Sequence, residues 1–336
     1  MIETIRKLVE TYGPSGHEDK IREVILQEIE GLADEVTVDA MGSVIAWKRS
    51  GADDAPVVML SAHMDEIGVM VTHVDEKGYL RFTNIGGLGL VTLIGNRVLF
   101  EDGTVGVIGV ESGLEAGKAP TMEQLFIDVS TGDNGKGHNI RVGDAAGLLR
   151  NLEVRGDRLI AKSMDDRIGC ALQIGVMREL KGQQIPNDVA FVFSVQEEVG
   201  LRGARAAAYA VDPDIGIAID VTRTGDTPKA APMDVSLGKG PAIKVKDSGM
   251  LAAPEVIALM EQAAERAGVP YQLEVLERGT TDSAAMQLVR AGVRAGTLSI
   301  PCRYVHTTSE TVDINDVQNG VKLLVALLSE RVQVEA

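Results

Sequence analysis

Apolar residues recur along the chain with two different spacings, and the spacing changes twice. In the first part they recur every three or four residues, as at Ile5, Leu8 and Val9, which predicts helices on both sides of a Gly-Pro-Ser-Gly break at 13–16. Strands are expected next, and the run Val57–Leu60 has no polar residue, which is typical of a strand covered on both faces. This part of the chain therefore predicts an α/β arrangement.

From about residue 67 the pattern changes to short β-branched stretches separated by Gly-Gly, Asp-Gly and Asn-Gly pairs. The first of these stretches is Gly68–Val74 and the last is Glu153–Arg155. Many short strands with regular turn signals indicate a small all-β barrel or sandwich. We therefore expect an all-β module at 67–160, inserted into a discontinuous α/β domain that consists of 1–66 plus 161–336.

Strands and helices alternate again in the last part of the chain, as in an α/β domain. The expected strands are Leu159–Ala161, Val189–Val195, Ile215–Ile219, Ala242–Val245, Tyr271–Val275 and Arg294–Ile300. The expected helices are Asp166–Leu180, Ala204–Ala210, Pro254–Ala267, Asp282–Ala291 and Val317–Glu330. The fold class expected from the whole pattern is α/β with an inserted all-β module.

The composition excludes several classes of partner. The 336 residues include 33 Lys and Arg against 49 Asp and Glu, so the formal net charge is -16. Binding to nucleic acid or to an anionic membrane surface requires a basic face, so we expect neither partner. With 45% hydrophobic residues the chain has enough apolar material to form a core, which argues against disorder.

Cysteine usage and apolar runs bear on the location of the protein. Two cysteines, Cys170 and Cys302, are too few for a disulfide framework or a thiolate-rich zinc site. The N-terminus has no apolar signal segment, and no apolar run approaches the roughly 20 residues of a membrane span. We therefore expect a cytoplasmic protein, in which any metal site consists of histidines and carboxylates.

Five of the expected strands run directly into a residue that can bind a metal. These residues are His63 after Val57–Leu60, Asp165 after Leu159–Ala161, Glu197 and Glu198 after Val189–Val195, Asp220 after Ile215–Ile219, and His306 after Arg294–Ile300. Ligands of open α/β sheets collect at the carboxyl ends of the strands, so we expect these side chains to meet. Two histidines and several carboxylates suit two divalent metals.

Each residue alone has a simpler interpretation. His63 could be a hydrogen-bonded core histidine, Asp165 with Asp166 could cap the following helix, and Glu197-Glu198 could be a solvated pair. Five independent coincidences at five strand ends are a weak explanation, and burying that many carboxylates without a counter-ion would be very costly. The pattern therefore favours a metal site.

The chain resembles the tetrahedral (TET) aminopeptidases in five motifs. They are His-x-Asp-Glu at 63–66, Asp-Asp-Arg at 165–167, Glu-Glu at 197–198, the isolated Asp220 after a strand, and Arg-Tyr-x-His at 303–306. The resemblance covers essentially the whole chain. It implies a mixed-sheet, zinc-exopeptidase-like catalytic domain and, at 67–160, a PDZ-like module for oligomerisation and gating. It also implies a homo-oligomer, namely a dodecamer built from dimers.

The resemblance further implies a role for each motif residue. The implied ligands are His63 and Asp220 for one metal, His306 and Glu198 for the other, and Asp165 as the bridge between them. Asp165 would form a cis peptide with Asp166, and Asp65 would fix the orientation of His63. Glu197 would be the general base. The segment Arg278–Asp282 resembles a Gly-Thr-Asp loop near the specificity pocket of the family.

The implied activity is that of a metal-dependent aminopeptidase that removes N-terminal residues from short peptides with two divalent ions, Zn or Co. A deacylase or amidase acting on acylated amino acids could use the same metals. A glycosidase would need only a carboxylate pair, and 3% aromatic residues leave few side chains to stack on sugars. A scaffold without activity would be expected to lack Glu197, which is present.

Overall fold

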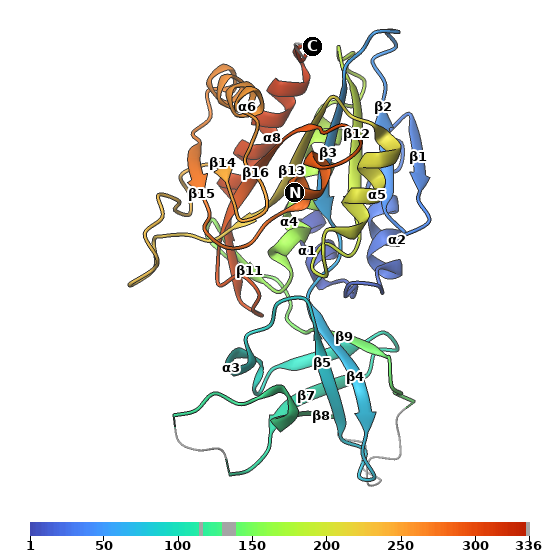
Figure 1. Cartoon of the computed structure of the whole chain (residues 1–336), viewed down its shortest axis with the longest axis vertical. Helices are drawn as coiled ribbons and strands as arrows, with labels where there is room; N and C mark the ends of the chain where they lie inside the picture. The colour runs from blue at the N-terminus through green and yellow to red at the C-terminus, as the bar shows by residue number, and fades with distance from the viewer. Residues whose placement is uncertain (114–116, 130–138, 334–336) are drawn as a thin grey trace.

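The computed structural model describes residues 1–113, 117–129 and 139–333. In Figure 1 a large sheet with helices on both faces forms the upper part of the molecule, and a small barrel of strands lies below it. Within the described residues, none of the helices is both long and apolar enough to cross a membrane.

The described helices and strands follow the chain in this order. The helices are α1 (Ile2–Glu10), α2 (Asp19–Glu28), α3 (Leu90–Leu93), a 3-10 turn at Met122–Gln124, α4 (Met164–Glu179), α5 (Arg202–Val211), α6 (Pro254–Ala267), α7 (Asp282–Gln287) and α8 (Ile314–Leu328). The strands up to the end of the barrel are β1 (Glu35–Val38), β2 (Val44–Lys48), β3 (Val57–His63), β4 (Gly68–Val74), β5 (Leu80–Ile85), β6 (Arg97–Phe100), β7 (Val105–Val110), β8 (Leu125–Asp128) and β9 (Ala145–Leu148). The remaining strands are β10 (Glu153–Arg155), β11 (Arg158–Ala161), β12 (Asp188–Ser194), β13 (Ile215–Thr222), β14 (Ala242–Lys246), β15 (Gln272–Val275), β16 (Arg294–Arg303) and β17 (Glu310–Asp313).

The large sheet is mixed, with a parallel centre. Its strand order is β1-β2-β12-β3-β13-β16-β17-β11-β10, and β14 and β15 branch from β16. Strands β12, β3, β13 and β16 are mutually parallel, so their carboxyl ends lie at one edge. Because β11 is antiparallel to β17 and β17 is antiparallel to β16, β11 also ends at that edge. The predicted mixed α/β class is confirmed.

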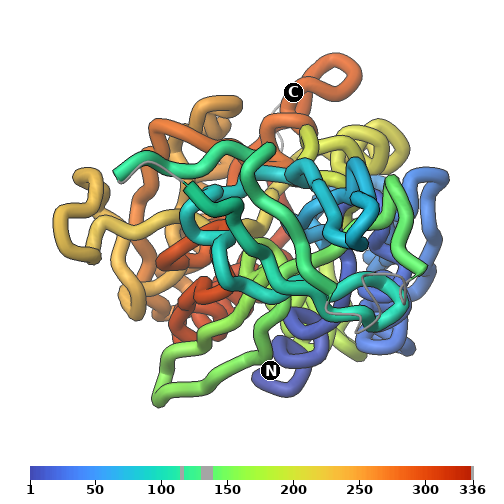
Figure 2. The backbone as a smooth tube through the Cα atoms, turned by 90° about the horizontal axis from the view of Figure 1, so that it is seen from below, coloured from blue at the N-terminus to red at the C-terminus, as the bar shows by residue number. Residues whose placement is uncertain are grey.

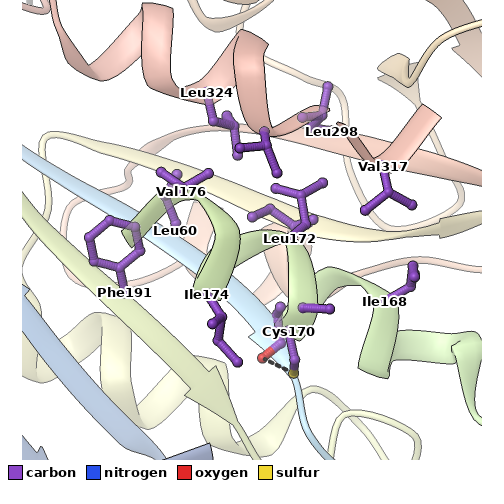
Figure 3. Packing of buried hydrophobic residues seen from close by; sticks show 14 of the residues in the cluster. Leu60, Ile168, Cys170, Leu172, Ile174, Val176, Phe191, Leu298, Val317 and Leu324 are labelled. Atoms are coloured by element: carbon purple, nitrogen blue, oxygen red, sulfur yellow. Dashed lines mark hydrogen bonds between the residues drawn. The ribbon is translucent and has the colours of Figure 1, made fainter. Parts of the chain in front are cut away.

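Alternating side chains of the central strands pack against helices on opposite faces of the sheet. Leu60 of β3 belongs to the core that contains α4 and α8, whereas Met59 points to the smaller core that contains α5 and α7. Helix α4 packs on the sheet against β3 and β13 and also contacts α1 and α8. Figure 3 shows its Leu172 close to Leu324 of α8, with Phe191 of β12 nearby. This packing fixes the start of α4 at the sheet edge.

The all-β module is a closed barrel with a core of its own. Its strands follow the order β4-β5-β8-β7-β6-β9, and apolar side chains such as Val69, Leu80 and Ile127 fill it. Figure 2 shows the barrel in front of the sheet when the molecule is viewed from below. The prediction of a small all-β structure is thus met by a six-stranded barrel within the described residues. Its PDZ-like character and the exact domain boundaries stay predictions.

Three local differences from the sequence analysis have physical reasons. Glu153–Arg155 was expected in the all-β module, but as β10 it pairs with β11 in the large sheet. Helix α7 ends four residues before the predicted Ala291, because Arg290 and Gly292 have positive φ values of 52° and 104°. Strands β9 and β17 were not predicted, and the four residues of Ala145–Leu148 show no alternation that would mark a strand.

Candidate active site

The parallel strands bring the predicted site residues to one edge of the large sheet. His63 is the last residue of β3, and Asp220 lies near the end of β13. Glu197 and Glu198 follow β12, and His306 follows β16. Four separate segments therefore converge where the carboxyl ends of the parallel strands meet, as predicted for ligand sites in such sheets.

Asp165, near the start of α4, lies between the two histidines. Its Oδ1 is 3.0 Å from Nε2 of His63, and its Oδ2 is 3.2 Å from Nε2 of His306. The same Nε2 of His306 is 3.2 Å from Oε1 of Glu198. The peptide bond between Asp165 and Asp166 is cis, as the resemblance implies. A carboxylate that turns one oxygen to each histidine has the geometry of a ligand that could bridge two metals.

Two groups of side chains in the described residues have ligand atoms within 4.8 Å of one another, close enough to hold a metal ion. They are His63, Asp166 and Asp220, and His63, Asp165 and Glu198. The first group contains the predicted pair His63 and Asp220, and adds Asp166, to which the sequence analysis gave no ligand role. In the second group His63 stands where His306 was expected, although His306 is itself close to Glu198. Imidazole and carboxylate ligands of this kind suit zinc and cobalt.

Asp65 holds the backbone and the histidine around the site in place. Its Oδ1 is 3.4 Å from Nδ1 of His63 and accepts a 3.0 Å hydrogen bond from the Glu197 backbone N–H. Its Oδ2 accepts from Ser15 Oγ at 2.6 Å and from the Glu198 backbone N–H at 3.2 Å. The orientation of His63 and the position of the two glutamates therefore depend on one fully buried carboxylate, as expected for a residue behind the ligands.

The electrostatics of this sheet edge favour a bound cation. Burial and neighbouring carboxylates raise the pKa of Glu197 and of Asp220 well above their usual values. Although burial lowers the pKa of His306, the carboxylates of Asp165 and Glu198 raise it to about 11. Oε1 of Glu198 is buried beside His306 without a hydrogen bond from the described residues. A divalent cation would replace the bound protons and reduce the repulsion, so these residues fit a metal centre.

Two buried carboxylates near the site had no individual role assigned from the sequence: Glu310, and Asp282, which was singled out only as the last residue of the segment Arg278–Asp282. Glu310 at the start of β17 accepts the backbone N–H of His306 at 2.7 Å and that of Asp165 at 3.1 Å. Asp282 at the start of α7 accepts hydrogen bonds from serine hydroxyls of β3 and β12 at 2.7 and 2.5 Å. Neither follows a central parallel strand, so the strand-end pattern could not mark them. Glu310 nevertheless links the segments that carry Asp165 and His306.

A pocket of about 460 Å³ opens onto this cluster. Asp165, Glu197, Glu198, Asp220 and His306 line one side of it. The rest of the lining is formed by Gly200, Leu201, Val221, Thr222, Arg223, Lys244, Leu276, Arg278, Gly279, Thr280 and Val305. Residues 278–280 belong to the loop that the resemblance places near the specificity pocket. A ligand in this pocket would therefore contact both the carboxylate cluster and that loop.

Comparisons with known proteins agree with this arrangement. Residues 42–323 match the sequence profile of M42 glutamyl aminopeptidase. A putative aminopeptidase of Acetivibrio thermocellus is 44% identical over 326 residues, which cover 97% of each chain. The solved structure of the aminopeptidase APDkam598 from the archaeon Desulfurococcus kamchatkensis superimposes with a TM-score of 0.92 at 38% identity, covering 98% of this chain and 94% of that chain. The TET1 peptidase of Pyrococcus horikoshii, which can assemble into a tetrahedron or a large octahedral shell, superimposes with a TM-score of 0.86 at 31% identity and covers 98% and 99%.

Proposed function

The chain belongs to the M42 glutamyl aminopeptidase family and is an aminopeptidase, and from this premise we propose how its site acts on short peptides. The proposal is a dinuclear centre with His63 and Asp220 on one side, His306 and Glu198 on the other, and Asp165 as the bridge. The observation that carries it is the position of Asp165, whose two oxygens lie 3.0 and 3.2 Å from the two histidines. When bound, two divalent ions would polarise the peptide carbonyl and lower the pKa of a water molecule toward neutrality.

Glu197 is the proposed general base. Its Oε2 is 3.8 Å from Nε2 of His63, and its backbone N–H is held by Asp65, so its side chain lies at the cluster and lines the pocket. It would take a proton from the attacking water and return it to the leaving amine. In the absence of metal ions, burial and the charges of Asp220 and Glu198 raise the pKa of Glu197 well above its usual value.

The family membership and the site geometry favour peptide hydrolysis over the alternatives. A glycosidase needs two carboxylates and gives no role to the two histidines beside Asp165. A protein without activity gives no reason for Glu197 at the cluster. A deacylase could use the same ligands, and it differs in requiring a blocked amine, whereas an aminopeptidase requires a free one. Substrate pairs with and without an N-terminal acyl group therefore separate these two activities.

We infer that the chain forms a homo-oligomer, and we propose that this is a dodecamer built from dimers. Support comes from the TET1 peptidase of Pyrococcus horikoshii, which can assemble into a tetrahedron and covers the same chain length.

Zinc or cobalt as the metal is likewise a proposal that rests on the imidazole and carboxylate ligands. A cytoplasmic location is also a proposal, and it is supported by Cys170 and Cys302, which are both buried free thiols, as is usual in a reducing compartment.

Hydrolysis of a panel of aminoacyl anilides tests the proposed function. The purified protein should cleave anilides that have a free α-amine, lose this activity after treatment with a chelator, and regain it with Zn²⁺ or Co²⁺. Matched anilides with an acetylated amine serve as the control and should not be cleaved. Preferential cleavage of the acetylated compounds would favour the deacylase, and full activity after verified removal of the metals would contradict the proposed centre.

A further inference from the structure

Two glycines at the end of the barrel strand β5 lie directly against the candidate site. Gly86 and Gly87 follow Ile85, the last residue of β5. A Cβ on Gly87 would be 2.9 Å from Nδ1 and 3.1 Å from Cε1 of His306. A Cβ on Gly86 would be 3.0 Å from Oε2 and 3.1 Å from Cβ of Glu198. The barrel backbone thus packs against the two residues proposed to bind the second metal.

The close approach requires glycine at both positions. Gly86 has a φ of +71°, which residues with a side chain rarely adopt, and its carbonyl accepts a 2.7 Å hydrogen bond from the Asn84 amide. Real Cβ atoms almost never lie 2.9 Å from another heavy atom, so any side chain on Gly87 would displace the imidazole of His306. The backbone at Gly87 therefore limits where this ring can lie.

The loop that carries His306 needs support from outside, because its backbone is strained. Tyr304 and His306 have positive φ values of 61° and 63°, which cost energy for residues with side chains. Glu310 of β17 holds the loop from the large sheet. From the barrel side, Asn96 Oδ1 accepts a hydrogen bond of 3.4 Å from Thr308.

A second residue near the barrel also supports this loop. Arg150 lies two residues after β9, the last barrel strand, and its Nη1 donates a 2.7 Å hydrogen bond to Ser309 Oγ. Together with Gly87 and Asn96, it forms a set of barrel contacts around the loop of the second histidine.

The other half of the site is built differently. His63 and Asp220 are part of the central strands β3 and β13. His63 lies beside Asp65, Asp165 and Glu197, and its backbone N–H donates to the Asp166 carboxylate at 3.3 Å. These partners follow β3 and β12 or lie at the start of α4, all in the large-sheet part of the molecule. The barrel contacts described above are concentrated on His306 and Glu198.

We propose that Gly87 is a positioning residue, through which the barrel holds His306 and Glu198 in the geometry for the second metal. The two metals then depend on different parts of the molecule: the one bound by His63 and Asp220 on the large sheet, and the one bound by His306 and Glu198 on the docked barrel as well. This inference rests on the proposed dinuclear centre. Partners that orient metal ligands typically change metal affinity by about 10–100-fold when they are altered.

The test is the binding of Co²⁺ to the metal-free full chain, measured by equilibrium dialysis with metal analysis and by the visible absorption of the bound ion. Wild type should bind two ions per chain. Gly87→Ala should retain one site with wild-type affinity and weaken the other by about tenfold or more. Gly89→Ala is the matched control, because Gly89 has a φ of -83° and its Cβ would meet only Thr92, at 3.1 Å from the hydroxyl oxygen. This variant should bind both ions as the wild type does.

The possible outcomes separate this inference from the proposed function. A wild type that binds fewer than two ions contradicts the dinuclear centre itself. If the wild type binds two ions and Gly87→Ala binds both with unchanged affinity, or loses both equally, the inference is overturned. Circular dichroism establishes that each variant is folded. If Gly87→Ala does not fold, Arg150→Ala decides: selective weakening of one site supports the inference, and two unchanged sites overturn it.

Discussion

The buried carboxylates of the site differ in whether their surroundings stabilise or destabilise the charged form, and hence in the direction in which their pKa values are shifted. Burial raises the pKa of Asp65, but hydrogen bonds from His63 and Ser15 outweigh it and lower the pKa below its usual value. Among the residues that the structure describes, Glu197 has no comparable set of hydrogen-bond donors, and its pKa is raised by burial and by neighbouring negative charges. Environments that separate the pKa values of neighbouring groups are typical of sites where one group stays charged and another exchanges protons. Asp65 thus suits an orienting role and Glu197 the role of a base.

Replacement of Glu197 by Gln tests the role of this side chain as a base that is not a ligand. Glu197→Gln should bind nearly as much metal as the wild type and lose about 10²–10⁴-fold in turnover, because an amide cannot accept the proton. Asp165→Asn is the contrasting variant and should lose metal from both sites. Metal analysis together with the anilide assay distinguishes them. Unchanged turnover in Glu197→Gln would rule out its role as the base.

Site residues at the ends of central parallel strands could be predicted from the sequence, because each follows a run of apolar residues. His63 and Asp220 were found in this way, because the end of a buried apolar run can be seen in the sequence. Asp166 and Glu310 were assigned no ligand or orienting role, because each accepts a backbone N–H that is distant in sequence, from His63 and from Asp165 respectively. Gly87 could not be found either, since its importance lies in contact with a residue more than two hundred positions away. Such contacts follow from the tertiary structure alone.

At the level of elements, strands with continuous apolar runs were predicted well, whereas the two short strands β9 and β17 were not predicted. Val189–Val195 and Ile215–Ile219 correspond closely to β12 and β13, because a strand buried on both faces has an unmistakable composition. Strand β9 consists of Ala and Gly with one Leu, and its position in the barrel comes from pairing with β4 and β6. The assignment of β10 to the large sheet likewise depends on pairing. The local sequence of a strand does not encode which other strands it pairs with.

An ion pair joins β16 to the loop between β13 and β14, and it predicts a pH-dependent contribution to stability. Arg303 at the end of β16 donates two hydrogen bonds to Asp226, of 2.9 and 2.7 Å. This pairing holds the pKa of Asp226 well below its usual value. The pair therefore stabilises the fold fully at pH values above the unfolded pKa of about 4, and this stabilisation is lost as the pH falls through the lower folded value.

Asp226→Asn should accordingly lower the free energy of unfolding by about 1–3 kcal/mol at pH 7, because a charged hydrogen-bond acceptor is lost. The difference from the wild type should shrink as the pH is lowered below about 4, where Asp226 becomes protonated in the unfolded chain, and should be lost once the folded protein is protonated as well. Denaturant unfolding at several pH values measures this, with the exposed Asp234 replaced by Asn as the control. A difference that stays constant down to pH 2 would show that the charge of Asp226 is not its cause.

At the scale of the whole molecule, the barrel is inserted into the α/β part and shapes its site. The chain leaves the large sheet after His63 and returns to it at β10. Both connections therefore lie next to the sheet edge where the carboxyl ends of the parallel strands meet. The change in hydrophobic pattern indicated an inserted module, and the six strands of the barrel agree with it. A barrel was one of the two all-β forms that the pattern indicated, but its contact with His306 could not be predicted, because that contact depends on how separate segments pack.

The proposed assembly makes a prediction about mass and about salt. Twelve subunits with a formal charge of -16 each would carry about -190 in total, so apolar contacts must hold the shell together while repulsion opposes it. Repulsion between exposed charges is screened over about 8 Å at physiological ionic strength and over about 30 Å at 0.01 M. We therefore expect light scattering at physiological salt to give a mass near twelve times 35.7 kDa, and smaller species to increase as salt is removed. The metal-loaded protein is used in both conditions, with a metal-depleted sample as the control for the effect of the ions on assembly. A fully active monomer at physiological salt would contradict the dodecamer and leave the proposed chemistry of Glu197 and Asp165 unaffected.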